Sequence, residues 1–84
     1  GEIHAEMVSS VWQVLVQPGA QVAAGDTLVI LESMKMEIPV LTELAGIVQE
    51  LHVVEGEALQ EGDLIATVTA QRSRANERDS GESL

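Results

Sequence analysis

An internal repeat constrains this 84-residue chain more than any other feature of its sequence. A shift of 37 positions aligns identical or similarly apolar residues without a gap. The aligned pairs include Val11/Val48, Val16/Val53, Gly19/Gly56, Gly25/Gly62, Asp26/Asp63, Val14/Leu51, Val22/Leu59, Leu28/Ile65 and Leu31/Val68. Two copies are too few for a solenoid, which needs about three repeats. The repeat therefore predicts two halves that complete one core around a pseudo-two-fold axis, with the link between them at one end and both termini at the other.

Short apolar runs rich in β-branched residues lie between turn signals. The runs are Val11–Val16, Leu28–Leu31, Ile38–Leu41, Ile47–Val54 and Leu64–Val68, and the turns are marked by Pro18-Gly19, Gly25-Asp26, Gly46, Glu55-Gly56 and Gly62-Asp63. This spacing is typical of strands rather than helices. Phe and Tyr are absent, so the core must be aliphatic. We therefore predict a small all-β fold in which Pro39 lies on an edge strand or has its backbone nitrogen facing solvent, because proline cannot donate a ladder hydrogen bond.

The charge distribution argues against several classes of partner. The formal net charge is −10, and eleven acidic side chains but a single lysine fall within residues 1–70. Such a surface disfavours binding to nucleic acid and to anionic membranes. No run is long enough to span a bilayer, and residues 1–10 lack the features of a secretion signal, so a cytoplasmic location is expected. There is no cysteine, which excludes disulfides and thiol chemistry.

Composition divides the chain into two parts. Residues 71–84 are almost wholly polar, with mixed charges and no hydrophobic period. They could not bury enough apolar surface to offset the entropy of ordering. We expect one domain over residues 1–70 followed by a disordered tail over residues 71–84.

The only lysine, Lys35, lies in the predicted link between the halves, flanked by Met34 and Met36. The simpler interpretation is a solvated surface lysine between two adaptable apolar side chains. The alternative is a lysine that an enzyme finds and modifies, with the methionines as recognition elements on an exposed turn. The position of Lys35 in the link favours the alternative.

These residues resemble the biotin-attachment (biotinyl) domains of biotin-dependent carboxylases, especially the small stand-alone bacterial biotin/lipoyl attachment proteins. The resemblance covers about residues 3–69 and is carried mainly by Glu32-Ser33-Met34-Lys35-Met36-Glu37, with the Gly-Asp turns and Gly46-Ile47-Val48 in support. It implies a flattened β-barrel of two four-stranded antiparallel sheets with the lysine on a hairpin turn. One departure is Ser9, where the first half of such domains often has glycine.

The resemblance also implies a function. A biotin–protein ligase would join biotin to Lys35, with Met34 and Met36 recognised by the ligase. The chain would then be a non-catalytic carrier that shuttles carboxyl groups between a biotin carboxylase and a carboxyltransferase. Two alternatives are a lipoyl carrier, although lipoyl domains usually have Asp-Lys-Ala at this site, and an unmodified β-barrel that acts as an interaction module.

Other polar or unusual residues carry weaker signals. Glu32 and Glu37 are expected to be solvated rather than catalytic, because an acid–base pair normally requires a pocket. His4 and His52 lack metal-ligand spacing, and no metal site is expected. Trp12 could fill the core or lie on the surface as a partner contact, and we expect it in the core.

Overall fold

The computed structural model describes residues 1–70 as eight strands and, within that range, no helix. The predicted tail over residues 71–84 lies outside the described residues. No helix in the described range could cross a membrane. The strands are β1 (Glu2–His4), β2 (Ser9–Val14), β3 (Gln21–Val22), β4 (Thr27–Ser33), β5 (Met36–Leu41), β6 (Gly46–Leu51), β7 (Ala58–Leu59) and β8 (Leu64–Ala70).

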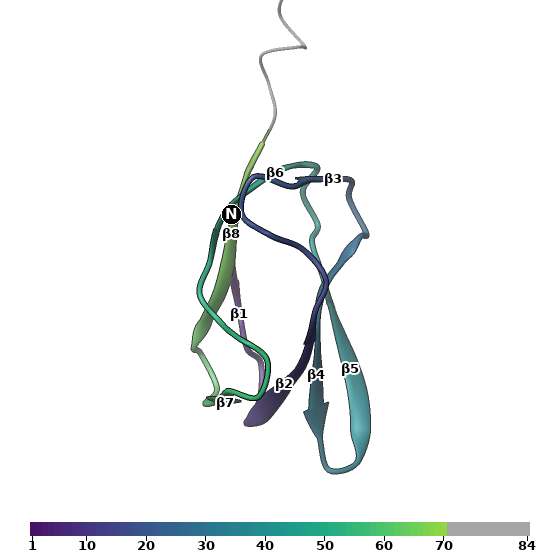
Figure 1. Cartoon of the computed structure of the whole chain (residues 1–84), viewed down its shortest axis with the longest axis vertical. Helices are drawn as coiled ribbons and strands as arrows, with labels where there is room; N and C mark the ends of the chain where they lie inside the picture. The colour runs from purple at the N-terminus through teal and green to yellow at the C-terminus, as the bar shows by residue number, and fades with distance from the viewer. Residues whose placement is uncertain (71–84) are drawn as a thin grey trace, which may run out of the picture.

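The strands form two four-stranded sheets, which we call sheet A (β1-β8-β6-β3) and sheet B (β5-β4-β2-β7). Every strand pair is antiparallel. The predicted all-β fold of two four-stranded antiparallel sheets is therefore confirmed (Figure 1). Pro39 lies on β5, an edge strand, as its missing N–H requires.

The sequence repeat is a structural repeat. The bounds of β2, β3 and β4 differ from those of β6, β7 and β8 by 37 residues each, and β1 corresponds to the last part of β5. Sheet A combines β6 and β8 of the second half with β1 and β3 of the first, and sheet B combines β2 and β4 of the first half with β5 and β7 of the second. This exchange explains why neither half could close a core alone, as the pseudo-two-fold prediction requires.

The two Gly-Asp motifs make the same turn in both halves. Gly25 and Gly62 both have φ of +92°, a backbone region that other residues rarely adopt. The following carboxylate accepts a hydrogen bond from a backbone N–H three residues earlier, at 2.9 Å for Asp26 and 2.8 Å for Asp63. Each motif therefore needs a glycine for the backbone and an aspartate to satisfy the turn.

The core between the sheets is aliphatic. Its members are at most 7% exposed, and they occur largely as repeat-related pairs: Val11/Val48, Val22/Leu59, Leu28/Ile65, Val29/Ala66 and Leu31/Val68, together with Ala5 and Val53. Thr42 is also buried, and its hydroxyl is satisfied because it donates to the Leu44 carbonyl and accepts from the Leu44 N–H. The predicted aliphatic core is confirmed.

The two ends of the molecule differ. The N-terminus and the end of β8 lie together at one end, and the turn that joins β4 to β5 lies at the other (Figure 1). The residues between β4 and β5 are Met34 and Lys35. The single lysine is therefore placed at the tip farthest from the N-terminus, as the repeat predicted.

Candidate functional site

The candidate site is the hairpin formed by β4 and β5. Ser33 pairs with Met36 at the last step of the ladder, which leaves Met34 and Lys35 as a two-residue loop. Their φ angles are 53° and 65°, and they are the only non-glycine residues with positive φ in residues 1–70. Positive φ at both central positions is the signature of a type I′ turn, whose twist matches that of paired strands.

This turn is strained by its own residues. A type I′ turn favours Asn-Gly, whereas here two long side chains occupy the left-handed region. The left-handed conformation costs an L-residue about 1 kcal/mol or more. The β4–β5 ladder, which extends from Thr27↔Leu41 to Ser33↔Met36, holds the turn in place. The turn therefore places Lys35 at the tip of the hairpin, outside the strand ladder.

The side chains of the tip are open to solvent. Met34 is 91% exposed and Met36 is 59% exposed, and Lys35 is exposed as well. Within residues 1–70 the ion pairs are two His–Glu contacts, so Lys35 takes part in none. The methionines are therefore not filling the core, and the lysine amine is accessible to a modifying enzyme.

A hydrogen bond anchors the base of the hairpin to the neighbouring loop. The Ser33 hydroxyl donates to the Val8 carbonyl at 3.0 Å, and the Ser9 hydroxyl donates to the Met7 carbonyl at 3.0 Å. The Ser33 bond connects β4 to the segment before β2, and the Ser9 bond is local to that segment. They position the turn on the body of the domain without burying any part of it.

Ser9 and its repeat partner Gly46 show why one glycine can be replaced and the other cannot. A Cβ added at Gly46 would lie 2.0 Å from the backbone oxygen of Thr69. The β6–β8 ladder pairs Gly46 itself with Ala70, whereas the β2–β4 ladder begins one residue later, at Ser10↔Glu32. Ser9 therefore has room for its side chain because its ladder is one pair shorter.

Glu32 and Glu37 face each other across the hairpin, one ladder step below Ser33↔Met36. Both are exposed. Like charges directly opposite on paired strands are destabilising. The two carboxylates are therefore solvated, as expected, and they place negative charge directly beneath the lysine turn.

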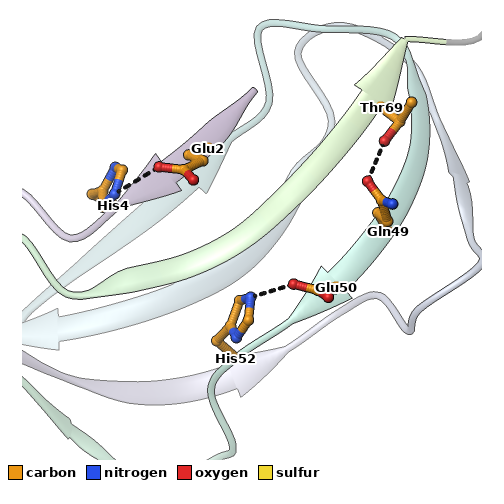
Figure 2. A network of polar contacts seen from close by, with 6 residues as sticks. All are labelled: Glu2, His4, Gln49, Glu50, His52 and Thr69. Atoms are coloured by element: carbon orange, nitrogen blue, oxygen red, sulfur yellow. Dashed lines mark hydrogen bonds and ion pairs between the residues drawn. The ribbon is translucent and has the colours of Figure 1, made fainter.

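Both histidines are exposed: His4 lies on β1 of sheet A, and His52 directly follows β6. His4 contacts Glu2 at 3.4 Å and His52 contacts Glu50 at 3.0 Å, as Figure 2 shows. No group of three or more potential metal ligands occurs among the described residues. Each histidine thus makes a local contact with the glutamate two residues before it in the chain.

The prediction that Trp12 fills the core is wrong. Trp12 is 45% exposed, on the outer face of sheet B. Val11 is 2% exposed, and successive side chains along a strand point to opposite faces, so Trp12 points outward. The register of β2 against β4 shifts between Val11 and Gln13, and this bulge returns Val14 to the core side.

Comparison with known proteins agrees with this geometry. Residues 1–68 match the biotin/lipoyl family model, whose description is "Biotin-requiring enzyme". The chain belongs to the biotin/lipoyl family. A biotinylated protein TB7.3 homolog of Mycobacterium leprae is 53% identical over 68 residues, which are 81% of this chain and 96% of that protein. The biotin/lipoyl attachment protein of Bacillus subtilis is 41% identical over 63 residues, 75% of this chain and 86% of that protein.

A solved structure also contains this biotin/lipoyl fold. The urea carboxylase of Kluyveromyces lactis aligns with a TM-score of 0.77 at 29% sequence identity. The match covers 82% of this chain but 6% of the carboxylase, so this domain corresponds to a small part of that enzyme. The resemblance to biotin-attachment proteins found in the sequence is therefore confirmed at the level of the family.

Proposed function

We propose that this domain is a biotin carboxyl carrier with biotin in amide linkage to the side-chain amine of Lys35. The observation that carries the proposal is the presentation of Lys35 on a type I′ turn, exposed, without an ion pair in residues 1–70, between two exposed methionines. An amine that is to be acylated must be accessible, and a family described as biotin-requiring supplies the identity of the acyl group. The residues at the turn fit this cofactor.

The domain itself would supply attachment and delivery. When bound, biotin provides the ureido nitrogen that accepts a carboxyl group from a biotin carboxylase and releases it to an acceptor at a carboxyltransferase. The lysine side chain and the biotin chain form a flexible tether at the tip of a rigid hairpin. Tethering raises the effective concentration of the carried group at each of two active sites. The likeness to urea carboxylase supports this carboxylase setting.

Substitution of Lys35 by arginine tests the attachment site. The change keeps the positive charge at an exposed turn but removes the primary amine, so biotin incorporation by a biotin–protein ligase should disappear. The thermal midpoint of unfolding should stay within about 2 °C of wild type, because exposed positions contribute little to stability. Streptavidin blotting after incubation with ligase, biotin and ATP reads the result. A biotin signal on the Lys35→Arg protein would overturn the proposal.

A second substitution tests the methionines and the lipoyl alternative together. The double variant Met34→Asp with Met36→Ala creates the Asp-Lys-Ala pattern typical of lipoyl domains. If Met34 and Met36 are recognised by the ligase, biotinylation at limiting ligase should fall, and a lipoate ligase should gain activity on the variant. Biotinylation of the double variant at the wild-type rate would show that the ligase recognises neither methionine.

The unmodified interaction module makes a different prediction for the wild-type protein. A domain that works without a cofactor should carry no biotin after co-expression with a biotin–protein ligase. The intact mass of the purified protein distinguishes a biotinylated, a lipoylated and an unmodified chain in one measurement.

A further inference from the structure

The repeat supplies an internal comparison for every surface position, since each half shows what the same place in the fold requires of a side chain. The outer face of sheet A, on β1, β6 and β8, is polar. Its residues are Glu2, His4, Gln49, Glu50, His52, Thr67 and Thr69. Figure 2 shows three contacts among them: His4 with Glu2, His52 with Glu50, and the Thr69 hydroxyl donating to Gln49 at 2.6 Å.

Five of the seven corresponding positions on sheet B are apolar, and the other two are Gln13 and Glu32. A shift of 37 residues relates Gln49 to Trp12, His52 to Leu15, Thr67 to Ile30, Glu2 to Pro39 and His4 to Leu41. We call these five side chains, Trp12, Leu15, Ile30, Pro39 and Leu41, the apolar face. Trp12 is 45% exposed, Leu15 50% and Leu41 49%. The two outer faces thus share one backbone architecture but differ in chemistry.

The core does not account for the apolar face. Val14, Val16, Ile38 and Val40 pack against the core, and the residues between them therefore point away from it. Ile30 likewise lies between Val29 and Leu31, which are 0% and 2% exposed. Sheet A builds the same strands with polar residues at these places, so the fold does not require apolar ones. Several exposed apolar side chains on one outer face of so small a domain are typical of an interaction site.

The apolar face continues into the hairpin that carries Lys35. Ile30 and Pro39 pair across β4 and β5, two ladder steps from Glu32↔Glu37 and three from Ser33↔Met36. Three ladder steps at about 3.4 Å per residue place Ile30 and Pro39 roughly 10 Å from the base of the turn. A protein that grips the lysine turn can therefore contact this face at the same time.

The charged residues beside the apolar face indicate which kind of partner protein would fit it. Glu32 and Glu37 lie opposite each other between the apolar face and the turn, without a basic neighbour in ion-pair contact within residues 1–70. Residues 1–70 contain eleven acidic side chains and one lysine, which opposes pairing with a second copy of the same chain. The fitting partner has an apolar centre with lysine or arginine placed against the two carboxylates.

We propose that the apolar face docks the biotin–protein ligase that modifies Lys35. This inference rests on the proposed function, since it takes Lys35 as the ligase substrate. A two-residue turn offers far less contact than the roughly 800 Å² per partner of a standard protein interface. The apolar face supplies the additional contact, since Ile30, Pro39 and Leu41 lie on the two strands of the hairpin and Trp12 lies on the neighbouring β2. Its loss should therefore weaken binding of the carrier to the ligase.

The repeat also supplies the test and its control. The double variant Trp12→Gln with Leu15→His introduces the residues that sheet A carries at the related positions, so the backbone already tolerates them. In steady-state assays with purified biotin–protein ligase, the KM for the carrier should rise about tenfold, as expected for the loss of a central aromatic contact, with kcat unchanged. The control variant Gln49→Ala with His52→Ala, on sheet A, should keep the wild-type KM. Thermal unfolding of each variant establishes that it is folded.

The outcomes separate this inference from the proposed function. A wild-type chain that accepts no biotin refutes the proposed function and the docking inference with it. A wild-type chain that is biotinylated, with a KM for the Trp12→Gln, Leu15→His variant within twofold of wild type, overturns the docking inference alone. A wild-type dimer in light scattering that the same variant converts to a monomer also overturns it, because the apolar face is then covered by a second copy. If the double variant does not fold, Leu41→His takes its place, with the same expected rise in KM.

Discussion

Replacing Met34 by glycine should make the domain more stable and a poorer ligase substrate at once. Met34 has φ of 53° and is 91% exposed, so its side chain gives almost no burial while its backbone occupies a strained region. Release of the left-handed strain is worth about 1 to 2 kcal/mol, and the added freedom of glycine in the unfolded chain takes back about 0.5 to 1 kcal/mol. The net gain in unfolding free energy should be about 0.5 to 1 kcal/mol, or a rise of about 2 to 8 °C in Tm.

Met36→Gly is the matched control for this substitution. Met36 lies two residues away, pairs with Ser33 in the ladder and does not have positive φ. Glycine should therefore destabilise the domain there by about 1 kcal/mol, because it relieves no strain and weakens a strand. Urea unfolding gives both free energies. A lower stability for Met34→Gly than for wild type would show that the turn is not strained in the way the φ angles indicate.

The effect of Met34→Gly on biotinylation should have the opposite sign. If the exposed Met34 side chain is recognised by the ligase, kcat/KM for the carrier should fall even though the protein is more stable. An unchanged kcat/KM in the stabilised variant would remove Met34 from the recognition site. The two measurements on Met34→Gly thus distinguish the effect of Met34 on the stability of the domain from its effect on recognition by the ligase.

Three further predictions concern the body of the domain and its surface charge. Gly46→Ala should lower the unfolding free energy by about 2 kcal/mol or more, because the new Cβ would lie 2.0 Å from the Thr69 oxygen. Ser9→Ala should lose only a hydrogen bond worth about 1 kcal/mol. Equal losses of the two variants in urea unfolding would contradict the close approach at Gly46. The biotinylation rate at sub-saturating carrier should fall as salt is raised, since the Debye length shrinks from about 10 Å at 0.1 M to 3 Å at 1 M, and a flat salt dependence would mean that charge does not steer docking. We also propose that residues 1–70 form an independent domain, so a chain that ends at residue 70 should keep the wild-type Tm and salt dependence; a loss of cooperative unfolding would count against it.

The topology could be predicted from the sequence because the repeat carries it. The positions of Gly25 and Gly62 mark two equivalent turns, and both have φ of +92°. The same repeat placed Lys35 in the link between the halves, and the turn between β4 and β5 that holds it lies at the end opposite the N-terminus, as Figure 1 shows for the two strands. Pro39 identified an edge strand because a proline has no N–H to give to a neighbour. Each of these predictions rests on a local backbone requirement that few residue types can meet.

Other features depended on register, which the apolar pattern does not specify. Alternation from the buried Val11 turns Trp12 outward, whereas the bulge between Val11 and Gln13 brings Val14 back to the core side. The positive φ of Met34 and Lys35 follows from the two-residue length of the loop, not from residues that favour that conformation. The exchange of β3 and β7 between the sheets also depends on contacts far apart in the sequence.

Locating the added mass within the chain tests the central claim most directly. The wild-type protein is incubated with biotin–protein ligase, biotin and ATP, and its fragments are sequenced by tandem mass spectrometry. The proposal predicts a single biotin mass in the fragments that contain Lys35, and no added mass in fragments from the rest of the chain. Biotin at any other residue, or an unmodified Lys35 in a reaction where a known carrier is fully biotinylated, would contradict the account.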